Sequence, residues 1–200
     1  NNGSGVWLTG GATRNVVLGN AIGVSALNGG AAIPNTGPGV FVDGGSTGNQ
    51  IGGVDPADGT AADGGNHIAF NGYTGILMDP DSALGNRVSR NSIHDNSVLG
   101  IDLGNDGRPS TDTDPYYRYP ELWGAWLFSN FTLVTGTIHN GADPMTLQFF
   151  VSDAADSSGF GQGQRFLLSV PLSSPGPFAL TIPGLPLGKF VSAIAIRTGG

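Results

Sequence analysis

Cysteine is absent from the 200-residue chain, which excludes a disulfide framework, thiol chemistry and a thiolate metal site. Charged residues make up only 12% of the sequence, about half the usual share, so long surface helices rich in Glu, Lys and Arg are not expected. The eight Lys and Arg residues are scattered singly and the formal net charge is −7, which disfavours nucleic acid and anionic lipid as partners. No apolar run approaches the roughly 18 residues that a membrane-spanning helix needs.

Glycine is the residue in excess, with 35 copies, more than twice its usual share. Hydrophobic residues nevertheless account for 38% of the chain, which is more than disordered chains contain, and no strict Gly-X-Y period indicates collagen. Two hundred residues are enough for one large or two small domains with a buried core. The composition therefore predicts a folded protein with many turns.

Two short phrases alternate along the first half of the chain. One phrase is Gly, aliphatic, any residue, aliphatic, and it begins at Gly5, Gly39, Gly75 and Gly100. The other is Asn, any residue, aliphatic, any two residues, Asn, and it begins at Asn15, Asn66, Asn86 and Asn91. The Gly phrase recurs after 34, 36 and 25 residues. The two longer intervals contain loop-like insertions at 25–37 and 53–65, rich in Gly, Ala, Asp and Pro.

The bare interval of 25 residues, with short strands bent at Asn and Gly, predicts a parallel β-helix over residues 1–115. Asn and Gly tolerate left-handed backbone dihedrals and are therefore expected at the corners of each coil. Asn residues stacked in successive coils are expected to form a ladder of side-chain amides. Period-two alternation places one set of aliphatic side chains inside the coils: Val40, Val42, Ile76, Met78, Ile101 and Leu103.

The second half lacks the Asn and Gly punctuation and contains longer alternating runs. These runs cover 131–139, 145–152, 165–173, 178–182 and 190–197. Strands at this spacing, separated by turn-rich breaks and without helical periodicity, predict a small β-sandwich over residues 116–200. On the third run, four side chains are expected to share one face: Phe166, Leu168, Val170 and Leu172.

Several motifs of the chain resemble those of a group of bacterial secreted and cell-surface proteins. The motifs are GIDLGNDG at 100–107, YPEL at 119–122, TLVTGTI at 132–138, LQFFVSD at 147–153, GFGQGQRFLL at 159–168 and FVSAIAI at 190–196. In such proteins right-handed parallel β-helix coils run directly into an immunoglobulin-like β-sandwich. The resemblance covers nearly the whole chain. It implies an all-β fold, with a short right-handed parallel β-helix at 1–115 and an immunoglobulin-like β-sandwich at 116–200, in an extracellular or cell-surface protein.

The low charge and repetitive geometry predict a non-catalytic structural or adhesive module, such as a surface stalk, an array component or a filament subunit. Because parallel β-helices also carry polysaccharide lyases and glycoside hydrolases, the alternative is the accessory end of a polysaccharide-active enzyme. Hydrolysis would need paired carboxylates, and lyase chemistry would need basic groups. The residues available for these roles are Asp79, Asp81, Asp95, Asp102, Arg87, Arg90 and His94. They are more simply explained as ordinary solvent-facing side chains.

One acidic loop is a candidate metal site. Asp106, Asp112 and Asp114 lie close together in the sequence, and Ca²⁺ prefers six to eight oxygen ligands of this kind. The spacing matches no EF-hand, and Asp is also a common turn former, so plain turn chemistry is the competing interpretation. His67 and His139 have no companion ligands in the sequence and do not indicate a zinc site.

The middle residue of each Gly phrase is expected to point outward. Three of these residues, Trp7, Phe41 and Leu77, are large and apolar, and the fourth is Asp102. An apolar column on the outside of the coils is expected to be covered by the sandwich, an insertion loop or another chain. Trp7, Phe41 and Leu77 are therefore the predicted partner-binding residues. The predicted partners are a second copy of the chain or neighbouring domains of a longer chain, with polysaccharide as a further ligand class.

Overall fold

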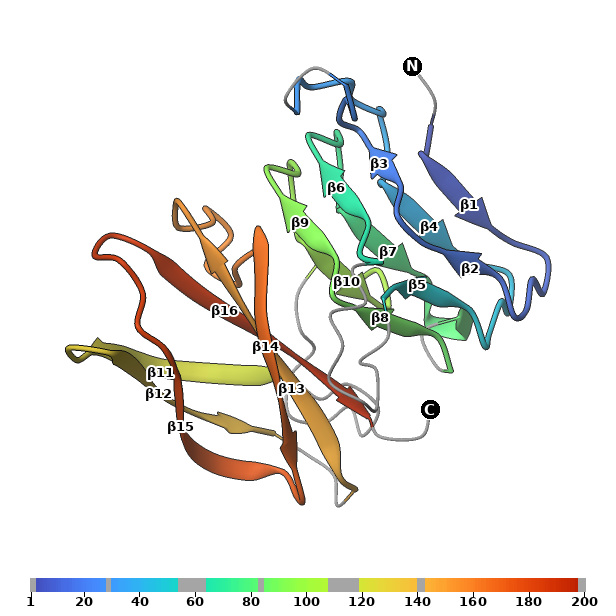
Figure 1. The fold of residues 1–200 in the computed structure, drawn as a ribbon. Coiled ribbons are helices and arrows are strands. Elements are labelled where there is room, and N and C mark those ends of the chain that lie inside the picture. Colours follow the sequence, from blue (N-terminus) through green and yellow to red (C-terminus); the bar gives the residue numbers. More distant parts are fainter. Residues whose placement is uncertain are drawn as a thin grey trace.

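The computed structural model describes residues 3–27, 30–53, 64–82, 85–107, 119–139 and 143–197. These residues form an all-β protein (Figure 1). Their one helical element is the short 3₁₀ turn η1 (Pro80–Ser82). Within these ranges no helix has the length and apolar character that crossing a lipid bilayer requires.

Ten short strands of the first half pair into three parallel sheets. One sheet contains β1 (Val6–Leu8), β4 (Val40–Val42), β7 (Ile76–Met78) and β10 (Ile101–Leu103). The second contains β2 (Val16–Val17), β5 (Gln50–Gly52) and β8 (Arg87–Ser89). The third contains β3 (Ala21–Ile22), β6 (His67–Ala69) and β9 (Ser92–His94). The chain thus visits the three sheets in turn, and each set of three consecutive strands is called a layer here: layer 1 is β1–β3, layer 2 is β4–β6 and layer 3 is β7–β9.

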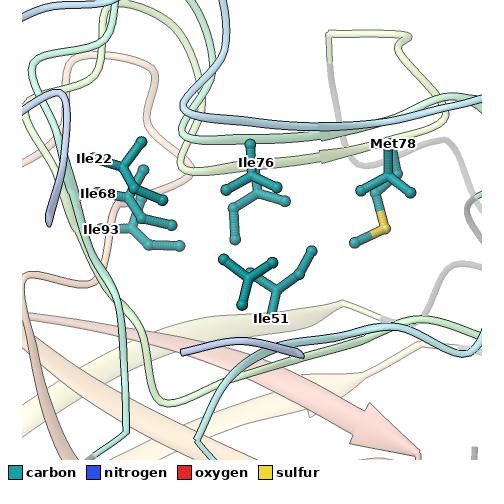
Figure 2. Packing of buried hydrophobic residues seen from close by; sticks show 9 residues of the cluster. Ile22, Ile51, Ile68, Ile76, Met78 and Ile93 are labelled. Carbon is teal, nitrogen blue, oxygen red and sulfur yellow. The ribbon is translucent and has the colours of Figure 1, made fainter. Parts of the chain in front are cut away.

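The inner side chains of the three parallel sheets form one hydrophobic cluster. Ile22, Ile68 and Ile93 come from successive layers and lie one above another in it (Figure 2). The residues predicted to point inward all belong to this cluster or pack against it: Val40, Val42, Ile76 and Met78 are buried, and Ile101 and Leu103 are half-buried. The predicted alternation and register of the first half are therefore confirmed.

Space rather than backbone conformation requires glycine at the start of the first three Gly phrases. A Cβ atom at Gly39 would lie 2.5 Å from Cγ2 of Ile68 and 2.7 Å from the carbonyl oxygen of Gly75 in the next layer. Gly5 faces Cγ2 of Ile22 at the same 2.5 Å. The φ angles of Gly5 and Gly39 lie outside the left-handed region. The prediction that glycine acts here as a left-handed corner is therefore wrong, because what excludes a side chain is the stacked isoleucine.

Seven left-handed corners are formed by the residue that precedes an asparagine of the repeat. Arg14, Phe70, Arg90 and Asp95 hold this position with φ angles of 58°, 61°, 56° and 54°. Gly19, Gly48 and Gly85 hold it at three further corners. Among the described asparagines, Asn105 alone has a positive φ. The prediction that Asn supplies the left-handed dihedral is thus wrong for the repeat, where asparagine contributes through its side chain.

Six longer strands form two antiparallel sheets in the second half, ordered β11–β12–β15 and β14–β13–β16. The strands are β11 (Pro120–Leu127), β12 (Phe131–Ile138), β13 (Met145–Ser152), β14 (Arg165–Leu172), β15 (Gly176–Pro183) and β16 (Phe190–Arg197). Five of them match the predicted runs, whereas β11 was not predicted beyond its YPEL motif. The predicted boundary at residue 115 lies outside the described residues.

A second hydrophobic cluster joins the two antiparallel sheets, with buried side chains from β12, β13 and β15. Of the four β14 residues predicted to share its face, Leu168, Val170 and Leu172 pack against this cluster. Phe166 does not, because the pairing of β13 with β14 shifts register between Phe149 and Phe150. Phe166 meets Phe150 edge to face at 5.8 Å instead, on the side of the sheet that faces layer 3.

Candidate functional site

Three ladders of asparagine side chains run through the layers, as the sequence predicted. In each ladder the Nδ2 amide of one asparagine donates a hydrogen bond to Oδ1 of the asparagine in the next layer, at 2.8–3.0 Å. The ladders are Asn15–Asn49–Asn86, Asn20–Asn66–Asn91 and Asn35–Asn71–Asn96. The inner members are buried, so each ladder satisfies polar groups that would otherwise be costly inside the protein.

The ladders have a direction, because in every bond between two asparagines the Nδ2 amide donates toward layer 3 and the Oδ1 atom accepts from the side of layer 1. At the layer 1 end, Oδ1 of Asn15, Asn20 and Asn35 accepts no hydrogen bond from any described residue. Strands β1, β2 and β3 each occupy the end of their sheet. The outer surface of layer 1, called the open face here, therefore combines three unused acceptors with three edge strands.

At the opposite end, the Asn35–Asn71–Asn96 ladder is closed by a residue from the second half of the chain. Gln162 accepts hydrogen bonds at its Oε1 from the backbone and side-chain amides of Asn96, at 3.2 and 3.0 Å, and its Nε2 donates to the carbonyl oxygen of Asn96 at 3.0 Å. The next residue, Gly163, accepts from the backbone amide of Ile93 at 2.7 Å. The segment around Gln162 thus takes the place of a fourth strand beside β9.

A second glutamine joins the two halves at β8. Gln148 is fully buried, accepts from the backbone amide of Arg90 at 3.0 Å and donates to Oγ of Ser89 at 3.0 Å. The guanidinium of Arg90 lies 4.3 Å from the centre of the Phe166 ring, a cation–π distance. These contacts explain why β13 is buried on both faces. They were not foreseen because they join segments about 60 residues apart that share no repeated phrase.

Replacing Gln162 by Ala should lower the free energy of unfolding by roughly 2–3 kcal/mol, since the buried amide groups of Asn96 lose their partner. Replacement of Gln164 is the matched control, because Oε1 of Gln164 accepts only an exposed bond from the backbone amide of Asp153. Urea denaturation of both alanine variants measures the difference. Equal losses in the two variants would contradict a closing role for Gln162.

The middle residues of the Gly phrases, called the outer column here, become less exposed from layer 1 to layer 3. Trp7 is 60% exposed, Phe41 is half-buried and Leu77 is only 5% exposed. The rings of Trp7 and Phe41 stack at 6.0 Å between centroids. Leu77 is thus already covered within the chain, whereas Trp7 presents its ring beside the open face. The prediction that these three residues bind a partner stays a prediction.

The outer column ends at Asp102, whose carboxyl group is buried. Asp102 is 2% exposed, and its Oδ1 has no hydrogen-bond partner among the described residues. Its Oδ2 accepts a bond of 3.3 Å from the backbone amide of Gly107. Burial raises the pKa of this carboxyl group above its ordinary value. Asp102 therefore lies inside the molecule and not in an exposed acidic cluster.

The acidic loop is described only in part. Asp106 is exposed, while Asp112 and Asp114 lie outside the described residues. Within the described ranges, no group of three or more His, Asp and Glu side chains is arranged to hold a metal ion. The Ca²⁺ site therefore stays a prediction. Of the carboxylates considered for glycoside hydrolysis, Asp95 follows β9 and Asp102 lies in β10, which belong to different sheets.

Two histidines meet on the third sheet, which the sequence analysis missed. Nε2 of His67 lies 2.8 Å from Nε2 of His94, and the rings are 4.9 Å apart. Nδ1 of His94 lies 2.7 Å from Oδ2 of Asp95. Burial, and to a lesser degree the neighbouring His94, lowers the pKa of His67. Placing the phrases at Asn66 and Asn91 in register would have put the two histidines on neighbouring strands, offset by two residues.

The third histidine lies apart from this pair. Nε2 of His139 is 2.8 Å from Oε2 of Glu121, and its ring lies against that of Tyr119 at 5.4 Å.

Comparison with known proteins found no matching family model and no matching curated protein.

Proposed function

We propose that the chain is a non-catalytic structural module of the extracellular surface. In this proposal the layers are coils of a right-handed parallel β-helix, and the two antiparallel sheets form an immunoglobulin-like β-sandwich that ends the coil stack. The observation that carries it is the direction of the asparagine ladders. Among the described residues, each ladder has an unused acceptor in layer 1, and the Asn35–Asn71–Asn96 ladder is closed at its other end by Gln162. A module of this kind suits a stalk or an ordered surface array.

The proposed occupant of the open face is a further coil with an asparagine at three corners. Such a coil would donate to Oδ1 of Asn15, Asn20 and Asn35 and pair with the edge strands β1, β2 and β3. A second copy of the chain fits less well. If two open faces met, acceptors would face acceptors, and in a head-to-tail contact the Asn96 donor is already bonded to Gln162. We therefore favour a neighbouring coil over self-association.

Extending the chain by one coil tests the proposal. A copy of residues 75–99, the bare repeat unit, is placed directly before Gly5. The free energy of unfolding should rise by roughly 2–4 kcal/mol, because half-exposed apolar side chains of layer 1 become buried. The matched control carries Asn→Ala changes at the three copied ladder positions, which correspond to Asn86, Asn91 and Asn96, and should gain clearly less.

Light scattering at tens of micromolar accompanies the denaturation measurements. The original chain and the extended chain should both be monomeric. An extended chain that is no more stable than its alanine control would overturn the role of the ladders. An original chain that forms dimers or polymers through the Trp7 side would replace the neighbouring coil with a second copy as the occupant.

A further inference from the structure

The His67–His94 pair is held in a geometry that presents two ring nitrogens to one point. The two residues lie on adjacent parallel strands, β6 and β9, where His67 pairs with Ser92 and Ala69 pairs with His94. Ile68 and Ile93 point into the hydrophobic cluster, so by the alternation of a strand the histidines project from the opposite face. Their Nε2 atoms are 2.8 Å apart.

The neighbours of His94 fix both its ring and its tautomer. The carboxylate of Asp95 lies 2.7 Å from Nδ1 of His94, so a neutral His94 carries its proton on Nδ1 and a lone pair on Nε2. Phe70 meets the His94 ring edge to face at 6.0 Å. A carboxylate on the outer nitrogen of a histidine is the arrangement that orients metal-binding imidazoles in proteins.

We propose that His67 and His94 form a two-ligand site for a borderline divalent transition-metal ion, with Asp95 as the positioning residue for His94. A metal with bonds of about 2.0–2.1 Å to two nitrogens in tetrahedral geometry separates them by roughly 3.3 Å. The pair would therefore open by a small side-chain movement. In the neutral pair, Nε2 of His67 donates the shared proton. On metal binding this proton moves to Nδ1 of His67, and no net proton is released.

Imidazole nitrogen determines which ions suit the site. Zn²⁺, Ni²⁺ and Cu²⁺ bind imidazole well, whereas Ca²⁺ and Mg²⁺ prefer oxygen ligands. A bound ion would link layer 2 to layer 3 across β6 and β9. Because the two ligands come together in the folded chain, binding should raise the thermal midpoint of unfolding.

Calorimetric titration with Zn²⁺ and thermal unfolding with and without Zn²⁺ test the site on the full chain. We expect one equivalent of Zn²⁺ to bind and to raise the melting temperature, with no effect of Ca²⁺ at equal concentration. His67→Ala and His94→Ala should each abolish both effects. Asp95→Asn should weaken binding about 10-fold, the lower end of the usual effect of an outer partner of a metal-binding histidine.

His139→Ala is the matched control, since His139 is the third and last histidine of the chain and pairs with Glu121. It should bind Zn²⁺ like the original protein. If the alanine variants of the pair fail to fold, proton NMR of the unaltered chain decides instead. Paramagnetic Ni²⁺ should broaden the ring signals of His67 and His94 and spare those of His139. No binding by the original protein, equal loss in His139→Ala or equal response to Ca²⁺ would each overturn the site.

Discussion

Replacing Asn66 by Ala is expected to lower the free energy of unfolding by about 4 kcal/mol, because several buried groups lose their partners together. Oδ1 of Asn66 accepts from the backbone and side-chain amides of Asn20, both at 3.0 Å. Its Nδ2 donates to the carbonyl oxygen of Val17 at 2.8 Å and to Oδ1 of Asn91 at 2.9 Å. Asn66 is 1% exposed, so water cannot easily replace these bonds.

The matched control for Asn66 is Asn20, the first member of the same ladder. Asn20 is exposed and donates to Asn66 without accepting a bond from a described residue. Asn20→Ala should therefore lower the free energy of unfolding by about 1 kcal/mol, the usual net value of a hydrogen bond. Urea denaturation of both variants gives the comparison. Similar losses at the two positions would show that the ladder contributes no more inside the stack than at its open face.

The repeat was predictable because its physical cause lies within short phrases. Strand alternation, the inward aliphatic residues and the stacking of asparagines all follow from local spacing, and the contacts of Asn49 and Asn71 confirm the ladders. It was less predictable why a particular residue type occupies a particular position of the repeat. Glycine and asparagine can both adopt left-handed dihedrals, so composition alone suggested that use. Gly19, Gly48 and Gly85 do have this conformation, whereas at Gly39 the stacked side chain of Ile68 leaves no room for a Cβ atom.

The features that the sequence did not predict depend on contacts between segments without a common phrase. Gln162 lies in a glycine-rich segment that resembled a loop, and its role appears only when it is placed beside Asn96, 66 residues earlier. The rotation of Phe166 out of the core depends on a register shift in β13 and β14, which no spacing rule reveals. The His67–His94 pair is intermediate, because aligning two phrases of the repeat would have placed the residues on neighbouring strands.

The second large expected loss of stability concerns the stacked isoleucines, called the isoleucine column here, which are Ile22, Ile68 and Ile93. Ile68 is fully buried, and it lies between Ile22 of layer 1 and Ile93 of layer 3 (Figure 2). Ile68→Ala should lower the free energy of unfolding by about 4 kcal/mol, in the upper part of the range for buried Ile→Ala changes. Gly39 packs directly against Cγ2 of Ile68, and collapse of the backbone onto the cavity is limited by the stacked layers on both sides.

The same Ile→Ala substitution at Ile22 shows how much of the loss depends on the place of the residue in the isoleucine column, because the side-chain atoms removed are identical. Ile22 is covered by layer 2 on one side and lies next to the open face on the other, so the cavity left by Ile22→Ala can open to water and should destabilise by about 2 kcal/mol. In the chain extended by one coil, Ile22 becomes an inner member of the column. There Ile22→Ala should approach the effect of Ile68→Ala. An Ile22→Ala effect that is unchanged by the added coil would mean that the new coil does not stack on layer 1, even if the extended chain is more stable.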